Sequence, residues 1–285
     1  MRWENEERSS NVEDRRGMGM PTRMKGGGIG IILLALVGMY FGIDPSIIMN
    51  MGDSVQQAQV GPSGPVQQSP EEQRQAEFVS VVLAQTEETW HQIFSSSGKS
   101  YQEPKLVLFS GAVQSACGYA QAAMGPFYCP GDQKVYIDLS FFQELKRKLN
   151  SPGDFAQAYV IAHEIGHHVQ QLLVISDQVQ ARRQRISSTE YSKLSVMLEL
   201  QADCLAGVWA NRTDKVKKLV EPGDIEEAMN AASQIGDDRL QKQHQGYVVP
   251  DSFTHGSSAQ RVRWFRSGYE SGNVNNCNTF NAKHL

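Results

Sequence analysis

The sequence has few cysteines, little net charge and a low mean hydropathy, and each shortage excludes a class of protein. Four cysteines in 285 residues are too few for a small fold built on disulfides, although they allow two bridges in an oxidising compartment. A formal net charge of −4 gives no electrostatic reason to expect nucleic-acid binding. The mean hydropathy of −0.41 excludes a protein with many membrane spans.

One uncharged run, rich in Ile, Leu and Gly, covers residues 26–43. In a helix this run is roughly 27 Å long, close to the thickness of one hydrocarbon core. A buried core helix or the apolar part of a cleaved signal peptide are the alternatives. Three glycines at one end and the lack of a convincing small-residue cleavage site favour a retained anchor. The sequence therefore predicts one transmembrane helix over residues 26–43.

Basic residues precede this run, and acidic residues follow it. Arg15, Arg16, Arg23 and Lys25 lie before the run, and the next basic residue after it is Arg74. The positive-inside rule then places the N-terminus in the cytoplasm and the rest of the chain outside. We expect a single-pass protein of the inner (cytoplasmic) membrane with a periplasmic, or extracytoplasmic, domain.

The segments on either side of the predicted span are polar. Residues 1–25 mix both signs of charge with Gly and Ser, and are predicted to form a short mobile cytoplasmic arm. Residues 44–69 are rich in Gln, Gly, Pro and Ser, which is typical of a flexible stalk. Ser69, followed by a proline and two acids, is typical of a helix start, so the folded domain is expected over residues 70–285.

The pattern of the outer domain indicates an α+β fold that is mostly helical with a small β-sheet. Residues 70–94 have apolar side chains at helical spacing, whereas residues 105–109 and 134–139 are short and rich in β-formers. After residue 139 the pattern is helical nearly to the end. Two strands followed by helices favour a small sheet on one side of the domain.

At least one bridge, between Cys117 and Cys129, is expected outside the cytoplasm, whereas the sequence leaves open whether Cys204 and Cys277 also form one. Cys117 and Cys129 bracket a turn-rich segment, and their bridge would stabilise the fold by roughly 3 kcal/mol in the chain-entropy model. Cys204 and Cys277 are then left to pair, which would tie the tail to a central helix. The alternative is four free, partly buried thiols.

The strongest chemical signal is the pattern His-Glu-x-x-His at His163, Glu164 and His167. Histidines four apart on a helix leave the same face one turn apart, which suits two Zn²⁺ ligands. Glu164 is placed to take a proton from a metal-bound water. Because residues 158–175 are otherwise uncharged, the helix is expected to be buried, where such groups are costly unless they are paired or hold a metal. The pattern alone has roughly one chance in a hundred of arising randomly, so a second element is needed.

A second predicted helix, over residues 189–211, carries Glu199 and Asp203 on one face. Most of their neighbours are apolar or small, so these acids are also charges on a buried helix. Two such helices facing each other would give three ligands and an open fourth position. That arrangement is typical of a catalytic rather than a structural zinc site.

With these motifs the chain resembles a known family. His163-Glu164-x-x-His167 with a downstream Glu199-x-x-x-Asp203 is similar to the gluzincin arrangement. More closely, the chain resembles the YpfJ-type neutral zinc metallopeptidases, which are membrane-anchored bacterial proteins. The resemblance covers essentially the whole chain. Besides the single span, the matching segments are residues 11–16 (NVEDRR), 125–130 (GPFYCP), 163–170 (HEIGHHVQ) and 199–204 (ELQADC).

The resemblance implies a zincin-like fold and a role for each motif residue. His163, His167 and Glu199 would be the zinc ligands, and Glu164 the general base. Asp203 would accept the outer N–H of a ligand histidine, although Asp203 in place of Glu199 as third ligand is the main rival. These roles imply a zinc peptidase that acts on a peptide or protein substrate, with no expectation about the oligomeric state.

A zinc peptidase also needs a donor for the developing oxyanion and a surface for the peptide. The donor candidates are Tyr247 and His255, and packing at a helix N-terminus is the alternative role of His255. Thr254 and His255, followed by Arg261, are similar to a Thr-His-x-x-x-x-x-Arg stretch in some other membrane-associated zincins. By analogy with zincins, residues 135–138 are the candidate edge strand for an extended peptide.

Two other functions fit the same residues. One is a non-catalytic envelope protein with a structural zinc, and the other is a zinc amidohydrolase acting on cell-wall peptides. Glu164 argues against the first, because a purely structural site needs no carboxylate beside its first ligand. The amidohydrolase would use the same residues as the peptidase.

Overall fold

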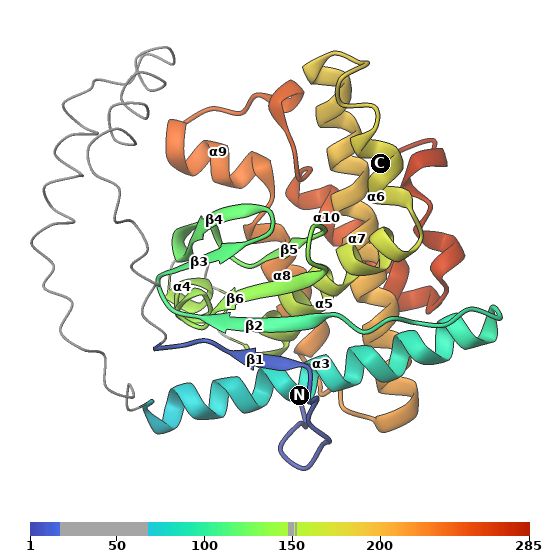
Figure 1. Ribbon diagram of the computed structural model, residues 1–285. Helices are drawn as coiled ribbons and strands as arrows, with labels where there is room; N and C mark the ends of the chain where they lie inside the picture. The colour runs from blue at the N-terminus through green and yellow to red at the C-terminus, as the bar shows by residue number, and fades with distance from the viewer. Residues whose placement is uncertain (18–67, 148–150, 152) are drawn as a thin grey trace, which may run out of the picture. The chain divides into compact units, whose positions relative to one another are not determined.

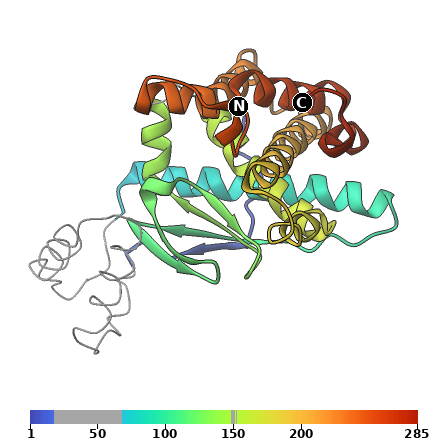
Figure 2. The same ribbon diagram turned by 90° about the horizontal axis from the view of Figure 1, so that it is seen from above.

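The fold is described by a computed structural model for residues 1–17, 68–147, 151 and 153–285 (Figure 1). Residues 1–15 and 68–285 cluster into one unit. This unit is mostly helical and contains a small sheet, so the predicted α+β class is confirmed. Figure 2 shows the helices gathered on one side of the sheet.

The main sheet within the described residues combines parallel and antiparallel pairing. Its strands, in spatial order, are β1 (Val12–Asp14), β2 (Lys105–Phe109), β6 (Lys134–Asp138) and β5 (Phe127–Cys129). The first three run parallel, and β5 runs antiparallel to β6. β2 and β6 are almost wholly buried, which explains their continuous apolar sequences. A separate hairpin pairs β3 (Ala112–Ser115) with β4 (Gly118–Gln121).

The position of β6 corrects the prediction for the peptide-binding edge. Residues 135–138 belong to β6, which pairs with β2 on one side and β5 on the other. A strand paired on both sides has no free backbone groups for a peptide. The edge of the described sheet on this side is β5.

The first strand comes from the segment predicted to be a mobile arm. β1 lies beside β2 (Figure 1), and its Val12 is in register with Leu106. Trp3 is only 6% exposed and meets Phe78 edge-on, with ring centroids 5.3 Å apart. The prediction of a mobile arm is therefore wrong for residues 1–15, because they complete the sheet and fill part of the core. The folded domain consists of residues 1–15 and 68–285 rather than 70–285 alone.

The predicted transmembrane helix over residues 26–43 lies outside the described residues, as does the predicted stalk up to residue 67. Among the helices of the described ranges, none is both long and apolar enough to cross a membrane.

The helix that follows the predicted stalk begins where the sequence indicates. Ser69 caps α3 in a reciprocal capping box with Glu72. The helices are α3 (Pro70–Ser96), α4 (Ser140–Arg147), α5 (Asp154–Leu172), α6 (Ile175–Gln180), α7 (Ser188–Lys217), α8 (Asp224–Gln234), α9 (Asp237–Gln245) and α10 (Ser258–Ser271). The described part of the chain also contains short 3-10 helices: η1 (Ala122–Met124), η2 (Pro250–Ser252), η3 (Val274–Cys277) and η4 (Thr279–Asn281).

Two glycines allow the backbones of α5, α7 and α10 to approach closely. A Cβ atom on Gly166 of α5 would lie 3.1 Å from the backbone of Ala202 on α7. A Cβ atom on Gly268 of α10 would overlap the carbonyl of Cys204 on α7. Larger residues at these positions would push the helices apart, and the side chains between them would no longer meet.

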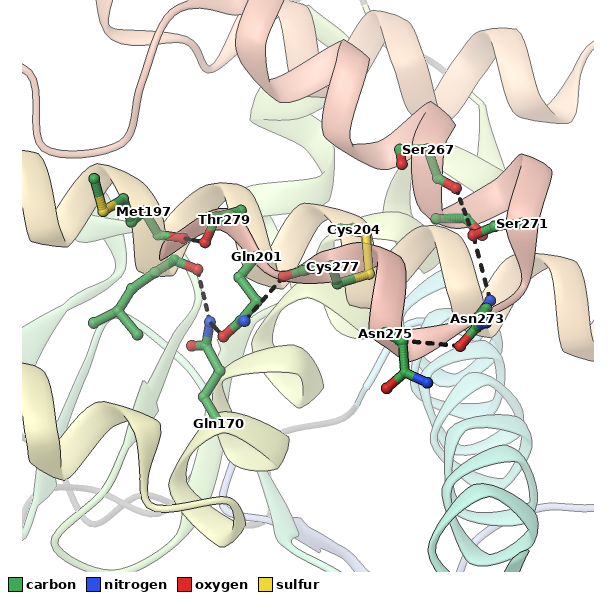
Figure 3. The surroundings of a disulfide bond; sticks show 12 residues. Gln170, Met197, Gln201, Cys204, Ser267, Ser271, Asn273, Asn275, Cys277 and Thr279 are labelled. Atoms are coloured by element: carbon green, nitrogen blue, oxygen red, sulfur yellow. Dashed lines mark hydrogen bonds between the residues drawn. A yellow bond between two sulfur atoms is a disulfide. The ribbon is translucent and has the colours of Figure 1, made fainter. Parts of the chain in front are cut away.

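The predicted Cys117–Cys129 disulfide is present, and so is the Cys204–Cys277 disulfide, which the sequence left open. One joins Cys117, in the turn between β3 and β4, to Cys129 at the end of β5. The other joins Cys204 of α7 to Cys277 of η3 (Figure 3). The second bridge ties the C-terminal segment to the helix that carries Glu199.

Candidate metal centre

The middle of α5 carries the His-Glu-x-x-His motif into the core. Apolar residues surround the motif along the helix, so α5 is buried on nearly every side. The rings of His163 and His167 lie on the same side of the helix, with centroids 4.8 Å apart. Glu164 and His163 are both buried, whereas His167 is partly exposed.

Glu199 of α7 faces both histidines. Its Oε2 lies 3.2 Å from Nε2 of His163, and its Oε1 lies 3.4 Å from Nε2 of His167. One donor atom from each of the three residues lies within 4.8 Å of the other two. Two imidazole nitrogens and a carboxylate oxygen are ligands that Zn²⁺ prefers, and three protein ligands are typical of a catalytic site. The donor set therefore fits a zinc ion.

The charges at this site also suit a cation. Burial alone would raise the pKa of Glu199, but the adjacent imidazoles of His167 and His163 lower it well below its usual range. Burial alone would lower the pKa of His163, but Asp203 and Glu199 outweigh that effect and raise it to about 9. The metal-free site thus holds protons that a metal must displace, so zinc affinity should increase with pH.

Asp203 lies behind His163, away from the point where the three donors meet. It is fully buried, and its Oδ1 accepts hydrogen bonds from His163 Nδ1 at 2.9 Å and from the hydroxyl of Tyr159 at 2.5 Å. Arg261 Nε donates to its Oδ2 at 2.8 Å. Burial alone would raise the pKa of Asp203, but Arg261 and His163 lower it to about 2. These contacts occupy both carboxylate oxygens and favour the orienting role over the rival ligand role.

Arg261 and Tyr159 are site residues to which the sequence analysis assigned no role. Arg261 comes from α10, is only 2% exposed, and donates to Asp203 with two of its nitrogens. Its Nη2 also donates to the hydroxyl of Tyr159 at 3.2 Å. The Thr-His-x-x-x-x-x-Arg spacing was the available signal for Arg261. Nothing local in the sequence pointed to Tyr159.

A cavity of about 810 Å³ opens beside the candidate ligands. Its lining includes Glu164, His255 and Arg261, together with Phe127 and Tyr128 of β5. A space of this size is typical of a ligand-binding cleft. The structure therefore places the predicted base next to the predicted ligands, in a site that a substrate can reach.

Of the two oxyanion candidates, His255 lines the cavity and Tyr247 does not. Tyr247 is 62% exposed, beyond the C-terminal end of α9. The Nδ1 of His255 lies 3.2 Å from Oδ1 of Asp237 and 3.0 Å from the hydroxyl of Thr254. With Nδ1 held in this way, Nε2 is the nitrogen left for the cavity.

Asp237 fixes the loop that carries His255. Its Oδ2 accepts the backbone N–H groups of Thr254, His255 and Gly256 at 2.6–3.0 Å. Burial alone would raise the pKa of Asp237, but the side chain and backbone of His255 lower it. A carboxyl with a lowered folded-state pKa adds stability above its unfolded pKa of about 3.9, and this stability is lost as the pH falls through the folded value.

We therefore expect Asp237→Asn to lower the free energy of unfolding by about 1–3 kcal/mol at pH 7, because the hydrogen bonds to its charge weaken. The difference from wild type should shrink below about pH 4, where the wild-type carboxyl also becomes neutral. Urea unfolding at both pH values measures this. The matched control is Asp251→Asn, at an exposed position, which should change little. A difference that stays constant with pH would show that the charge of Asp237 adds no stability.

Comparison with known proteins is consistent with this site. A family model described as "Putative neutral zinc metallopeptidase" matches residues 1–280. The chain is 50% identical over 289 residues to "Uncharacterized protein YpfJ" of Escherichia coli (strain K12), covering 98% of this chain and 99% of that protein. It is 38% identical over 257 residues to "Uncharacterized protein Rv2575" of Mycobacterium tuberculosis, covering 87% and 86%. No solved structure matches the chain significantly.

Proposed function

The chain belongs to the neutral zinc metallopeptidase family, with zinc as its cofactor, and on this premise we propose that it hydrolyses peptide bonds at the site on α5 and α7. The observation that carries the proposal is the convergence of His163, His167 and Glu199 beside a cavity that Glu164 also lines. These three residues would hold the metal. Bound zinc supplies a Lewis acid that activates water and polarises a carbonyl.

The protein's own groups would move the protons. Glu164 accepts the proton of the attacking water, since it lies beside the first ligand and lines the cavity without belonging to the ligand set. It then passes that proton to the nitrogen of the leaving amine. The hydrogen bond to Asp237 raises the pKa of His255 and favours its imidazolium form, which donates from Nε2 to the developing oxyanion. Asp203 keeps His163 protonated on Nδ1, so that Nε2 is free for the metal.

The substrate would lie along β5. Phe127 and Tyr128 of this strand line the cavity, and β5 pairs only with β6 among the described strands. The hydroxyl of Tyr128 lies 3.0 Å from Nδ1 of His168 on α5, and this contact holds the strand against the helix that carries the metal ligands. An extended peptide that pairs with β5 would therefore pass beside Glu164.

The cavity bears on the structural-zinc alternative. A structural zinc site is closed by four protein ligands, whereas this cluster offers three donors and adjoins about 810 Å³ of open space. An open position is needed only where water and substrate must reach the metal. The geometry therefore supports a hydrolase over a structural metal site.

The function is tested with the full-length protein, a peptide library and cell-wall peptides. We expect cleavage of peptide bonds that stops when a chelator removes zinc and resumes when zinc is restored. A zinc-loaded protein that cleaves neither substrate set would contradict the proposal. Cleavage of cell-wall peptides alone would replace the peptidase with the amidohydrolase.

We also propose that residues 26–43 attach the protein to the cytoplasmic membrane and that the domain lies in the extracytoplasmic space. The two disulfides support an oxidising compartment. A phosphatase reporter that is active only outside the cytoplasm, fused after Leu285, should therefore be active in cells. An inactive but stable fusion would contradict the proposed location.

A further inference from the structure

His167 begins a chain of hydrogen bonds that runs through two buried glutamines. Its Nδ1 lies 2.9 Å from Oε1 of Gln170, one turn further along α5. Nε2 of Gln170 donates to Oε1 of Gln201 on α7 at 3.1 Å, and Nε2 of Gln201 donates to the carbonyl of Cys277 at 2.9 Å (Figure 3). Gln170 is fully buried, and Gln201 and Cys277 are nearly so. This hydrogen-bond chain thus joins a candidate zinc ligand to the C-terminal segment.

Two backbone carbonyls determine the direction of this chain. Gln170 also donates from Nε2 to the carbonyl of Leu198 at 2.7 Å, and Gln201 donates to that of Cys277. Since a carbonyl only accepts, each amide must turn its nitrogen towards it. The oxygen of Gln170 is then left facing His167. An amide oxygen also only accepts, so Nδ1 of His167 must carry the proton.

We infer that Gln170 and Gln201 are positioning residues that keep Nε2 of His167 free to bind zinc. The inference rests on the proposed ligand role of His167, whose Nε2 faces Glu199 at 3.4 Å. The two histidines are thereby oriented by different groups, a carboxylate for His163 and a neutral amide for His167. The amide orients the second ring without adding another buried charge to the site.

The C-terminal segment, where the hydrogen-bond chain ends, is bonded to α7. Cys277 is bonded to Cys204, which lies three residues after Gln201 on the same helix. Two residues beyond Cys277, the hydroxyl of Thr279 donates to the carbonyl of Met197 at 2.6 Å. The C-terminal segment is therefore held to α7 on both sides of Gln201, which keeps the accepting carbonyl in place.

A pair of substitutions at Gln170 separates positioning from packing. Gln170→Leu and Gln170→Glu both remove the nitrogen that donates to Leu198, and Gln170→Glu also adds a buried charge, so it should lose at least as much stability as Gln170→Leu. Only Glu keeps an oxygen for His167 Nδ1. We expect zinc affinity, measured by chelator competition, to fall about 10–100-fold in Gln170→Leu, the usual effect of losing such a partner. In Gln170→Glu it should equal or exceed the wild-type affinity.

Gln85 supplies the matched control. It is another buried glutamine, and its amide donates to Glu6 at 3.1 Å, outside the hydrogen-bond chain from His167 to Cys277. Gln85→Leu should lose some stability and keep wild-type zinc affinity. Gln201→Leu should weaken zinc binding less than Gln170→Leu does, because the carbonyl of Leu198 still orients Gln170.

The outcomes that overturn the inference are specific. Equal losses of affinity in Gln170→Leu and Gln170→Glu would assign Gln170 a packing role only, and unchanged affinity in Gln170→Leu would leave it no role at the metal. If Gln170→Leu does not fold, Gln201→Leu decides, and wild-type affinity there would overturn the inference. Absence of zinc binding in the wild-type protein would instead contradict the proposed function.

Discussion

Glu164→Gln should bind zinc as tightly as the wild-type protein and turn over its peptide substrate at least about 10²-fold more slowly. The substitution keeps the size of the side chain, and Glu164 is not one of the three converging donors, so the metal should stay. It removes the one group of the motif that can accept the proton of the attacking water. Because the loss falls on the transition state, kcat should fall while KM changes little.

Two further variants calibrate this result. Glu144→Gln changes another glutamate that lines the same cavity, from α4, and should leave turnover nearly unchanged. His255→Ala should cost no more than about 10²–10³-fold, the range for one oxyanion donor. If Glu164→Gln cleaves as fast as wild type with zinc bound, the proposed mechanism is wrong and a structural zinc takes its place.

Glu199→Ala should abolish stoichiometric zinc binding, whereas Asp203→Asn should weaken it about 10–100-fold. The first substitution removes the only donor that α7 contributes to the three-residue cluster. The second leaves the donors in place but weakens the hydrogen bond that orients His163. Asp203→Asn should also lose about 3–5 kcal/mol of stability, because it leaves the charge of Arg261 buried without its partner.

Metal analysis of the purified variants and urea unfolding measure these effects. Glu190→Gln, an exposed position on the same helix, is the control and should keep full zinc. Full zinc in Glu199→Ala together with its loss in Asp203→Asn would transfer the ligand role to Asp203.

The metal motif was predictable because its geometry is local. The spacing of His163 and His167 places both rings on one face of any helix, whatever the rest of the fold does. The contact between α5 and α7 depends on tertiary structure. Two buried helices that carry polar side chains are nevertheless expected to pack against each other, because burying those side chains without partners is costly. The Cys117–Cys129 disulfide was predictable from its short loop and the expected compartment, whereas the second pairing was left open.

The residues behind the ligands were less predictable, because their contacts are distant in sequence. Arg261 and Asp203 are 58 positions apart, and an arginine in an amphipathic helix usually indicates an exposed face. The strand order was equally difficult to predict. Nothing in the sequence of residues 127–129 shows that they pair with β6 and so form the edge of the sheet in its place. β1 has three residues, two of them acidic, so its pairing with β2 depends on the partner rather than on its own pattern.

That pairing also has a consequence for where the two ends of the chain are found. Residues 1–15 and 68–285 belong to one folded unit, so both segments must reach the same compartment before β1 can pair with β2. A tag placed before Met1 should accordingly report the same compartment as a reporter placed after Leu285. Different compartments for the two would favour the predicted single pass and contradict the pairing of β1 with β2.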